Sequence, residues 1–161
     1  LEECLASLNQ FREREGAEMA ADIRSRNALV RECVRRMEEL RSQAVPALEA
    51  RLRERLSALL KEAPIEPQRL VQEAAFLADR SDVSEELTRL KVHAQQIEEL
   101  LEGSQEVGKK LDFLLQEMQR ETNAILSKAM GTGELGLAIT ELALKAKSEI
   151  EKIREQAGNL E

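Results

Sequence analysis

The stretch VGKKLDFLLQEMQRETNAILSKA, residues 107–129, decides the fold. Its apolar side chains recur every three or four residues, so they share one side of a helix with 3.6 residues per turn. These are Val107, Leu111, Leu114, Met118, Thr122, Ile125 and Ala129. The opposite side and one flank carry amides, carboxylates and bases: Asp112, Gln116, Arg120, Asn123 and Ser127, then Lys110, Glu117, Glu121 and Lys128. We predict a helix over 107–129 with a polar surface able to hold a metal ion or a phosphate.

The composition predicts an all-α protein. Leu, Ala, Glu and Arg dominate the 161 residues, Trp and Tyr are absent, and Phe and Pro occur three times each. Such a composition favours helices over strands. The net charge of −7 argues against non-specific binding of a phosphate backbone and suits divalent cations. No apolar run approaches the roughly 18 residues of a membrane span, so we expect no membrane contact.

The two cysteines and the first residue bear on compartment and completeness. Cys4 and Cys33 lack the spacing of a metal site, so we expect reduced thiols in a reducing compartment. The chain begins at Leu1 rather than Met, which suggests a fragment of a longer protein.

We expect residues 1–67 to form a long helical hairpin arm and its linker. An apolar stripe over 1–44 predicts a helix reaching about 65 Å, with Gly16 marking a kink or a close helix contact. Pro46 interrupts this pattern, and residues 47–61 resume it as the returning helix. Two prolines in residues 63–67 predict the linker.

We expect residues 68–161 to form an antiparallel helical bundle. A short helix over 68–79 precedes three long ones at 82–102, 107–129 and 134–159, the first of them starting at Ser81 or Asp82 and ending at Gly103. The glycines at 131, 133 and 136 match a dinucleotide-binding motif, but they follow a helix rather than a strand. We interpret them as a turn between helices.

Carboxylates and the single histidine suggest a metal site on two neighbouring helices. Glu86 and His93 would lie near Glu117 and Glu121 if these helices pack antiparallel. Two glutamates four residues apart can hold Mg²⁺ or Mn²⁺, and manganese also accepts histidine. Ordinary ion pairs within the bundle explain the same charges, and the spacing leaves both interpretations open.

The neighbouring bases extend the first interpretation to phosphodiester cleavage. Arg89, Arg120 or Lys128 could bind a phosphate, and His93 could act as an acid or a base.

Four segments resemble the YicC-like endoribonuclease family. They are KKLDFLLQEMQRETNAILSKA at 109–129, ADRSDVSEELTRL at 78–90 with His93, the ending at 149–161, and FREREGA at 11–17. The chain departs from the family pattern at Gln119, at Leu126 and in the spacer 131–136.

The resemblance implies a cytoplasmic bacterial endoribonuclease that uses Mn²⁺ or Mg²⁺ to cut single-stranded RNA. It also implies a homo-oligomer, with a hexamer as the expected form, and a further N-terminal domain, without which the fragment need not be active. Transferred to this sequence, the family positions are Glu85, Glu86, Arg89, His93, Asp112, Gln116, Glu117, Arg120, Glu121, Asn123 and Lys128.

Among these positions we assign roles. The catalytic set is His93, Glu86, Glu117 and Glu121; the metal set is Glu117, Glu121 and Glu86; the RNA-binding set is Arg89, Arg120, Lys128 and Asn123. The alternative is a non-catalytic helical scaffold that oligomerises or binds RNA.

Overall fold

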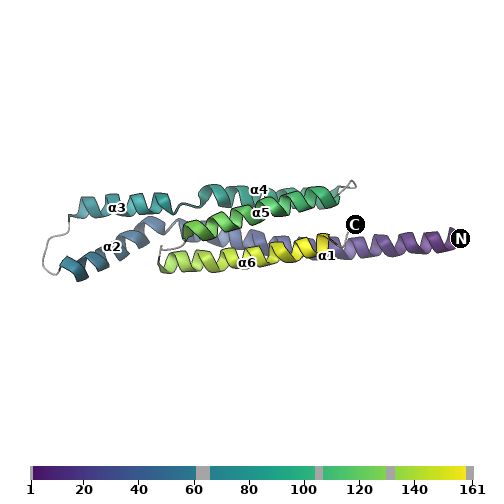
Figure 1. The fold of residues 1–161 in the computed structure, drawn as a ribbon, viewed down its shortest axis with the longest axis horizontal. Helices are drawn as coiled ribbons and strands as arrows, with labels where there is room; N and C mark the ends of the chain where they lie inside the picture. Colours follow the sequence, from purple (N-terminus) through teal and green to yellow (C-terminus); the bar gives the residue numbers. More distant parts are fainter. Residues whose placement is uncertain (1, 61–65, 104–106, 130–132, 159–161) are drawn as a thin grey trace.

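The computed structural model describes residues 2–60, 66–103, 107–129 and 133–158. Across these ranges the chain forms helices and no strand, which confirms the all-α fold class (Figure 1). The helices are α1 (Glu2–Arg41), α2 (Ala44–Leu60), α3 (Pro67–Arg80), α4 (Ser84–Glu102), α5 (Val107–Ala129) and α6 (Glu134–Ala157).

Four of these helices form one elongated bundle. Helix α5, with which the sequence analysis began, packs against both α4 and α6. Helix α1 also contacts both α4 and α6. The N-terminal half of α1 extends beyond this bundle at one end (Figure 1). At the other end, α2 and α3 pack against each other as a hairpin (Figure 1).

The core is aliphatic, as the composition indicates. Leu111, Leu115, Met118 and Ile125 of α5 have no exposed surface, and each such side chain contributes about 1.5–3 kcal/mol by its burial. They belong to one cluster with apolar residues of the three surrounding helices, including Ile23, Val30, Met37, Leu87, Leu90, Ile97, Ile150 and Ile153. The C-terminal half of α1 is therefore part of the bundle core.

The predicted helix boundaries agree with the structure in α5 and at the end of α4, whereas α2 begins at Ala44 rather than at residue 47 and includes Pro46. Helix α5 has the predicted bounds, and Gly103 ends α4 as expected. Helix α4 begins at Ser84, two to three residues after the predicted start, with Val83 at its N-cap and no side-chain capping bond. Oδ1 of Asp82 accepts the backbone N–H of Ser84 at 3.1 Å just ahead of the helix. Helix α1 continues through Gly16, where a Cβ atom would meet no other part of the described chain within 4 Å.

Other expectations are met only in part by the described residues. Gly133 precedes α6 with φ of 79°, a conformation that favours glycine, whereas residues 131 and 132 lie outside the described ranges. Cys33 is a buried free thiol, and its burial raises the pKa of that thiol. The side chain of Cys4 and most of the predicted linker 63–67 are not described. None of the described helices combines the length and apolar character that crossing a bilayer requires.

Candidate functional site

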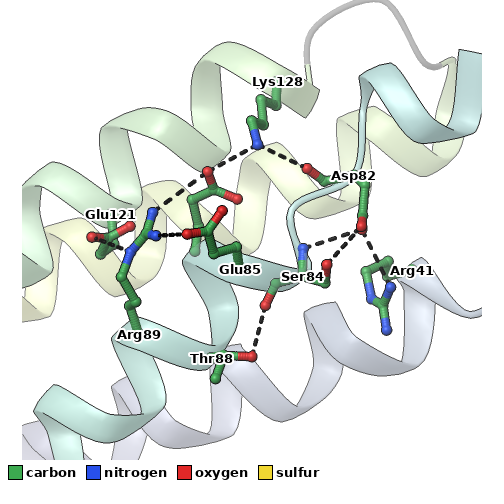
Figure 2. A network of polar contacts seen from close by, with 9 residues as sticks. Arg41, Asp82, Ser84, Glu85, Thr88, Arg89, Glu121 and Lys128 are labelled. Carbon is green, nitrogen blue, oxygen red and sulfur yellow. Dashed lines mark hydrogen bonds and ion pairs between the residues drawn. The ribbon is translucent and has the colours of Figure 1, made fainter.

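Arg89 of α4 gathers carboxylates where α4 meets α5 (Figure 2). Its Nε donates to Oε1 of Glu121, on α5, at 2.8 Å. Its Nη2 lies 3.7 Å from Oε1 of Glu86, and its Nη1 pairs with Glu85 one turn earlier on α4. These four carboxylate and guanidinium groups therefore join the two helices.

Lys128, near the end of α5, extends the same cluster. Its Nζ lies 2.9 Å from Oε1 of Glu86 and donates to the backbone oxygen of Asp82 at 3.1 Å. We call the set Asp82, Glu85, Glu86, Arg89, Glu121 and Lys128 the Arg89 network. Figure 2 shows Asp82 just before α4, Glu85 and Arg89 near the start of α4, and Glu121 and Lys128 in the second half of α5.

Glu86 is the unusual member of the Arg89 network. Its side chain is 6% exposed, and both cations approach its Oε1. Its other oxygen, Oε2, is buried and has no hydrogen-bond partner within the described residues. A buried polar atom without a partner costs free energy, so natural structures contain few of them.

The charge of Glu86 is nonetheless favoured. Burial by itself raises the pKa of this carboxyl, but the hydrogen bond and charge of Lys128, together with the charge of Arg89, outweigh it. The net result is a pKa below the usual value for Glu86. On the other side, the hydrogen bond with Glu121 raises the pKa of Arg89. The charged forms of Glu86 and Arg89 are therefore both favoured by their contacts.

Asp82 connects the Arg89 network to α1. Its carboxylate accepts hydrogen bonds from Arg41 at 3.2 Å and from the Ser84 hydroxyl at 2.6 Å (Figure 2). Burial raises the pKa of Asp82, and the bonds from Ser84 and Arg41 lower it further than burial raises it. Arg41 and Ser84 were not predicted from the sequence to belong to the site. The Asp-x-Ser spacing at the start of α4 could have indicated Ser84, but nothing local indicates Arg41.

His93 lies further along the same seam. Arg89 pairs with Glu121, and further along Gln96 and Leu100 line a hollow with Lys110 and Leu114. Along α4, His93 lies between Arg89 and Gln96, and along α5, Glu117 lies between Glu121 and Leu114. His93 is half-buried and its Nδ1 lies 3.1 Å from Oε1 of Gln96.

The predicted residues of α5 divide between two sides of that helix. Glu117 pairs with Arg120 at 2.6 Å, and Glu121 joins the Arg89 network. Asn123 instead accepts a hydrogen bond from Lys147 of α6 at 3.0 Å. The carboxylate of Asp112 likewise accepts from Arg154 of α6 at 3.2 Å, and from Gln116. The structure therefore brings Glu86, Arg89, Glu121 and Lys128 together and holds Asn123 and Asp112 at the α5–α6 seam.

Two carboxylates of the Arg89 network, both paired with the guanidinium of Arg89, are the groups that could bind a metal ion. Glu86 and Glu121 both contact Arg89, and Glu86 has the unpartnered oxygen. No group of three or more His, Cys, Asp or Glu side chains suited to a metal ion occurs in the described part of the chain. Mg²⁺ is commonly held by one or two carboxylates with substrate phosphates and water, so this pair fits such an ion only as a partial site.

The fold and this seam define a class: a helical-bundle protein with a partly buried cluster of carboxylates and bases between two antiparallel helices. Residues 37–161 match the protein family described as "Endoribonuclease YicC-like, C-terminal". The chain belongs to this family.

Two curated relatives carry the same description. The chain is 39% identical, along its whole length, to a "Probable endoribonuclease YicC" of Clostridioides difficile, and covers 54% of that protein. It is 41% identical to a "Probable endoribonuclease YicC" of Haemophilus influenzae over 77% of the chain and 42% of that protein. The chain thus spans about half the length of these relatives, and the family resemblance inferred from the sequence is confirmed.

Proposed function

We propose that this chain is the catalytic helical part of a divalent-metal-dependent endoribonuclease that cuts single-stranded RNA. The observation that carries the proposal is the buried, unpartnered Oε2 of Glu86, beside two bases and a second carboxylate, in a member of an endoribonuclease-like family. A buried acceptor of this kind is suited to a ligand that the free chain lacks.

Arg89 and Lys128 bind the phosphate next to the cleaved bond. Both are partly accessible, with side chains 41% and 39% exposed, and both now contact Glu86. An incoming phosphate offers each base a new anionic partner while its stem stays in place. Arg120, 71% exposed, contacts the RNA beside this position.

In this proposal Glu86 and Glu121 would hold Mn²⁺ or Mg²⁺, with a substrate phosphate and water completing the coordination. The bound ion supplies Lewis acidity and a more acidic water. Oxygen ligands are the donors that both ions accept, and the unpartnered oxygen of Glu86 supplies one without breaking a hydrogen bond.

His93 moves the proton. Imidazole can take up or release a proton near neutral pH, and the contact with Gln96 fixes the orientation of the ring. His93 and Glu117 lie on the two packed helices α4 and α5. We assign His93 the role of general acid or base toward the RNA.

We also propose a cytoplasmic homo-oligomer, a hexamer, for the whole protein. Between residues 10 and 22 of α1 no described side chain is buried, and this part extends past the bundle (Figure 1). A partner surface would remove its apolar residues from water.

The test is cleavage of single-stranded RNA by the whole protein that contains this chain. With Mn²⁺ or Mg²⁺ present we expect cutting, and Glu117→Gln and His93→Ala should each abolish it while circular dichroism shows an unchanged helix content. Undiminished cutting by both variants would overturn the assignment of the site. RNA binding or oligomerisation that persists in a chelator, without any cleavage, would favour the non-catalytic scaffold.

Metal binding has an independent readout in thermal melting. An ion that binds only the folded chain raises the midpoint by an amount set by RT ln(1 + [L]/Kd). We expect Mn²⁺ to raise the midpoint of the wild type more than that of Glu86→Gln. Equal shifts would remove Glu86 from the metal site.

A further inference from the structure

All three aromatic side chains of the protein lie on its surface. Phe11, Phe76 and Phe113 are 58–59% exposed, and the sequence has no Trp or Tyr. Aromatic rings normally supply much of a core, so an exposed ring forgoes that stabilisation. Phe113 also lines a hollow.

The hollow lies between α4 and α5 and has a volume of about 550 Å³. Its walls consist of Gln96, Glu99 and Leu100 from α4 and Lys109, Lys110, Phe113 and Leu114 from α5. The two lysines precede Phe113 by four and three residues, so they share its side of the helix. One surface therefore offers an aromatic face next to two positive charges.

The hollow continues the seam that carries the proposed site. Phe113 precedes Glu117 by four residues and Glu121 by eight, which corresponds to about 6 Å and 12 Å along α5. Gln96, which lines the hollow, is also the residue in contact with His93. A strand lying along the seam at the Arg89 network would reach the hollow next.

We propose that Phe113, Lys109 and Lys110 form a nucleotide-binding subsite for single-stranded RNA, next to the cleavage position. An unpaired base stacks on the ring of Phe113, and the phosphate beside it contacts the lysines. Stacking on an aromatic side chain together with a cationic path for the backbone is the usual way in which proteins hold unpaired strands. This inference rests on the proposed function.

Among the described residues that line the hollow, Glu99 is the one acidic residue, and it limits where the phosphate can lie. Its Oε1 accepts the amide of Gln95 at 3.4 Å. A carboxylate repels a phosphate but can accept the exocyclic amino group of a base. The base therefore lies toward α4 and the phosphate toward the lysines of α5.

A second copy of this chain is the competing occupant. An exposed phenylalanine suits a contact between subunits as well as a base. The adjacent lysine pair favours a polyanion, because depletion of lysine is typical of protein interfaces.

The first test uses the absence of tryptophan. In the whole protein, Phe113→Trp introduces the single indole of this chain, and a short uncleavable single-stranded RNA should quench its fluorescence on stacking. The matched control is Phe76→Trp, equally exposed on α3. Quenching at position 113 and not at 76 supports the subsite; equal response at both positions overturns it.

The second test measures affinity. Phe113→Leu keeps an apolar side chain and removes the ring, so the Kd for single-stranded RNA should rise about tenfold. Phe76→Leu should leave that Kd unchanged. Lys109→Gln with Lys110→Gln should weaken binding and make it less sensitive to salt.

These measurements separate the two proposals. A wild type that binds no RNA would contradict the proposed function itself. A wild type that binds RNA only as tightly as Phe113→Leu would overturn only the subsite. A changed subunit number in Phe113→Leu, measured by sedimentation, with unchanged RNA affinity would assign the hollow to a subunit contact and also overturn it.

Discussion

Two clusters of charged side chains join helices of the bundle, one at the α1–α6 seam and one at the α4–α5 seam. They differ in whether both oxygens of the buried glutamate have a hydrogen-bond partner. At the α1–α6 seam, Oε2 of Glu149 accepts Arg26 at 3.2 Å and Oε1 accepts Lys152 at 2.6 Å. Arg26 also donates to Asp22 at 2.8 Å. At the α4–α5 seam, both cations approach one oxygen of Glu86, and the other oxygen has no partner in the described ranges.

The two glutamates are equally buried, so burial alone does not distinguish them. Glu149 is 7% exposed and Glu86 is 5% exposed. Every carboxylate oxygen of Glu149 is used within the fold, which is what a structural cluster requires. The cluster around Glu86 leaves one acceptor oxygen without a partner among the described residues. We therefore expect ligand binding at the α4–α5 seam and a purely structural role for the cluster at the α1–α6 seam.

The largest difference between the two clusters should appear in the rate of RNA cleavage when Glu86 or Glu149 is replaced. We expect Glu86→Gln to lower the rate of RNA cleavage at least 100-fold, about 2.7 kcal/mol of transition-state stabilisation. Glu149→Gln should stay within threefold of wild type. Single-turnover cleavage of a labelled RNA measures both, and equal losses in the two variants would remove the distinction.

Stability should show the opposite order. Glu149→Gln loses two charged hydrogen bonds, and we expect a loss of about 1 kcal/mol in the free energy of unfolding, since its partners are partly solvated. Glu86→Gln should cost less, because one of its oxygens makes no bond to lose. Urea unfolding at pH 7 compares the variants, and a larger cost for Glu86→Gln would refute this ranking.

Acid should weaken the fold through both glutamates. The hydrogen bond from Lys152 lowers the pKa of Glu149, with that from Arg26 adding to it, and the pKa of Glu86 is also lowered. The unfolded chain then binds more protons, so this stability is present above about pH 4.5 and is lost as the pH falls through the folded pKa. We expect Glu149→Gln to flatten the decline below pH 4.5 in urea titrations; a slope equal to that of wild type would argue against the pairing.

The smallest effect is expected at the exposed edge of the Arg89 network. Glu85 pairs with Arg89, but its side chain is 75% exposed. Glu85→Gln should change cleavage less than threefold and leave the melting midpoint within error, because exposed ion pairs contribute little. A loss comparable with that of Glu86→Gln would extend the site to the outer face of α4.

Much of the fold follows from local pattern, and the site follows only in part. Helix α5 was predicted with its observed bounds, because its apolar period is regular from Val107 to Ala129. On the condition of antiparallel packing, the sequence predicted that Glu86 and His93 lie near Glu117 and Glu121, and the structure joins Glu86 to Glu121 through Arg89. Local pattern cannot predict that Asn123 turns to Lys147, since this depends on which flank of α5 the helix α6 covers.

Long-range partners are the second gap. Arg41 and Asp82 are 41 residues apart, and their ion pair depends on how α1 closes the bundle. The incorporation of the second half of α1 into the core likewise required the positions of α4 and α6. The apolar period of a helix predicts which of its sides is buried, but it does not predict which helix packs against that side.

The most direct test is a crystal structure of the whole protein with Mn²⁺ and a short uncleavable single-stranded RNA. We predict an anomalous manganese peak on the carboxylates of Glu86 and Glu121, with a phosphate on Arg89 and Lys128. Manganese and RNA bound on another face, with Glu86 still contacting only Lys128 and Arg89, would contradict the account.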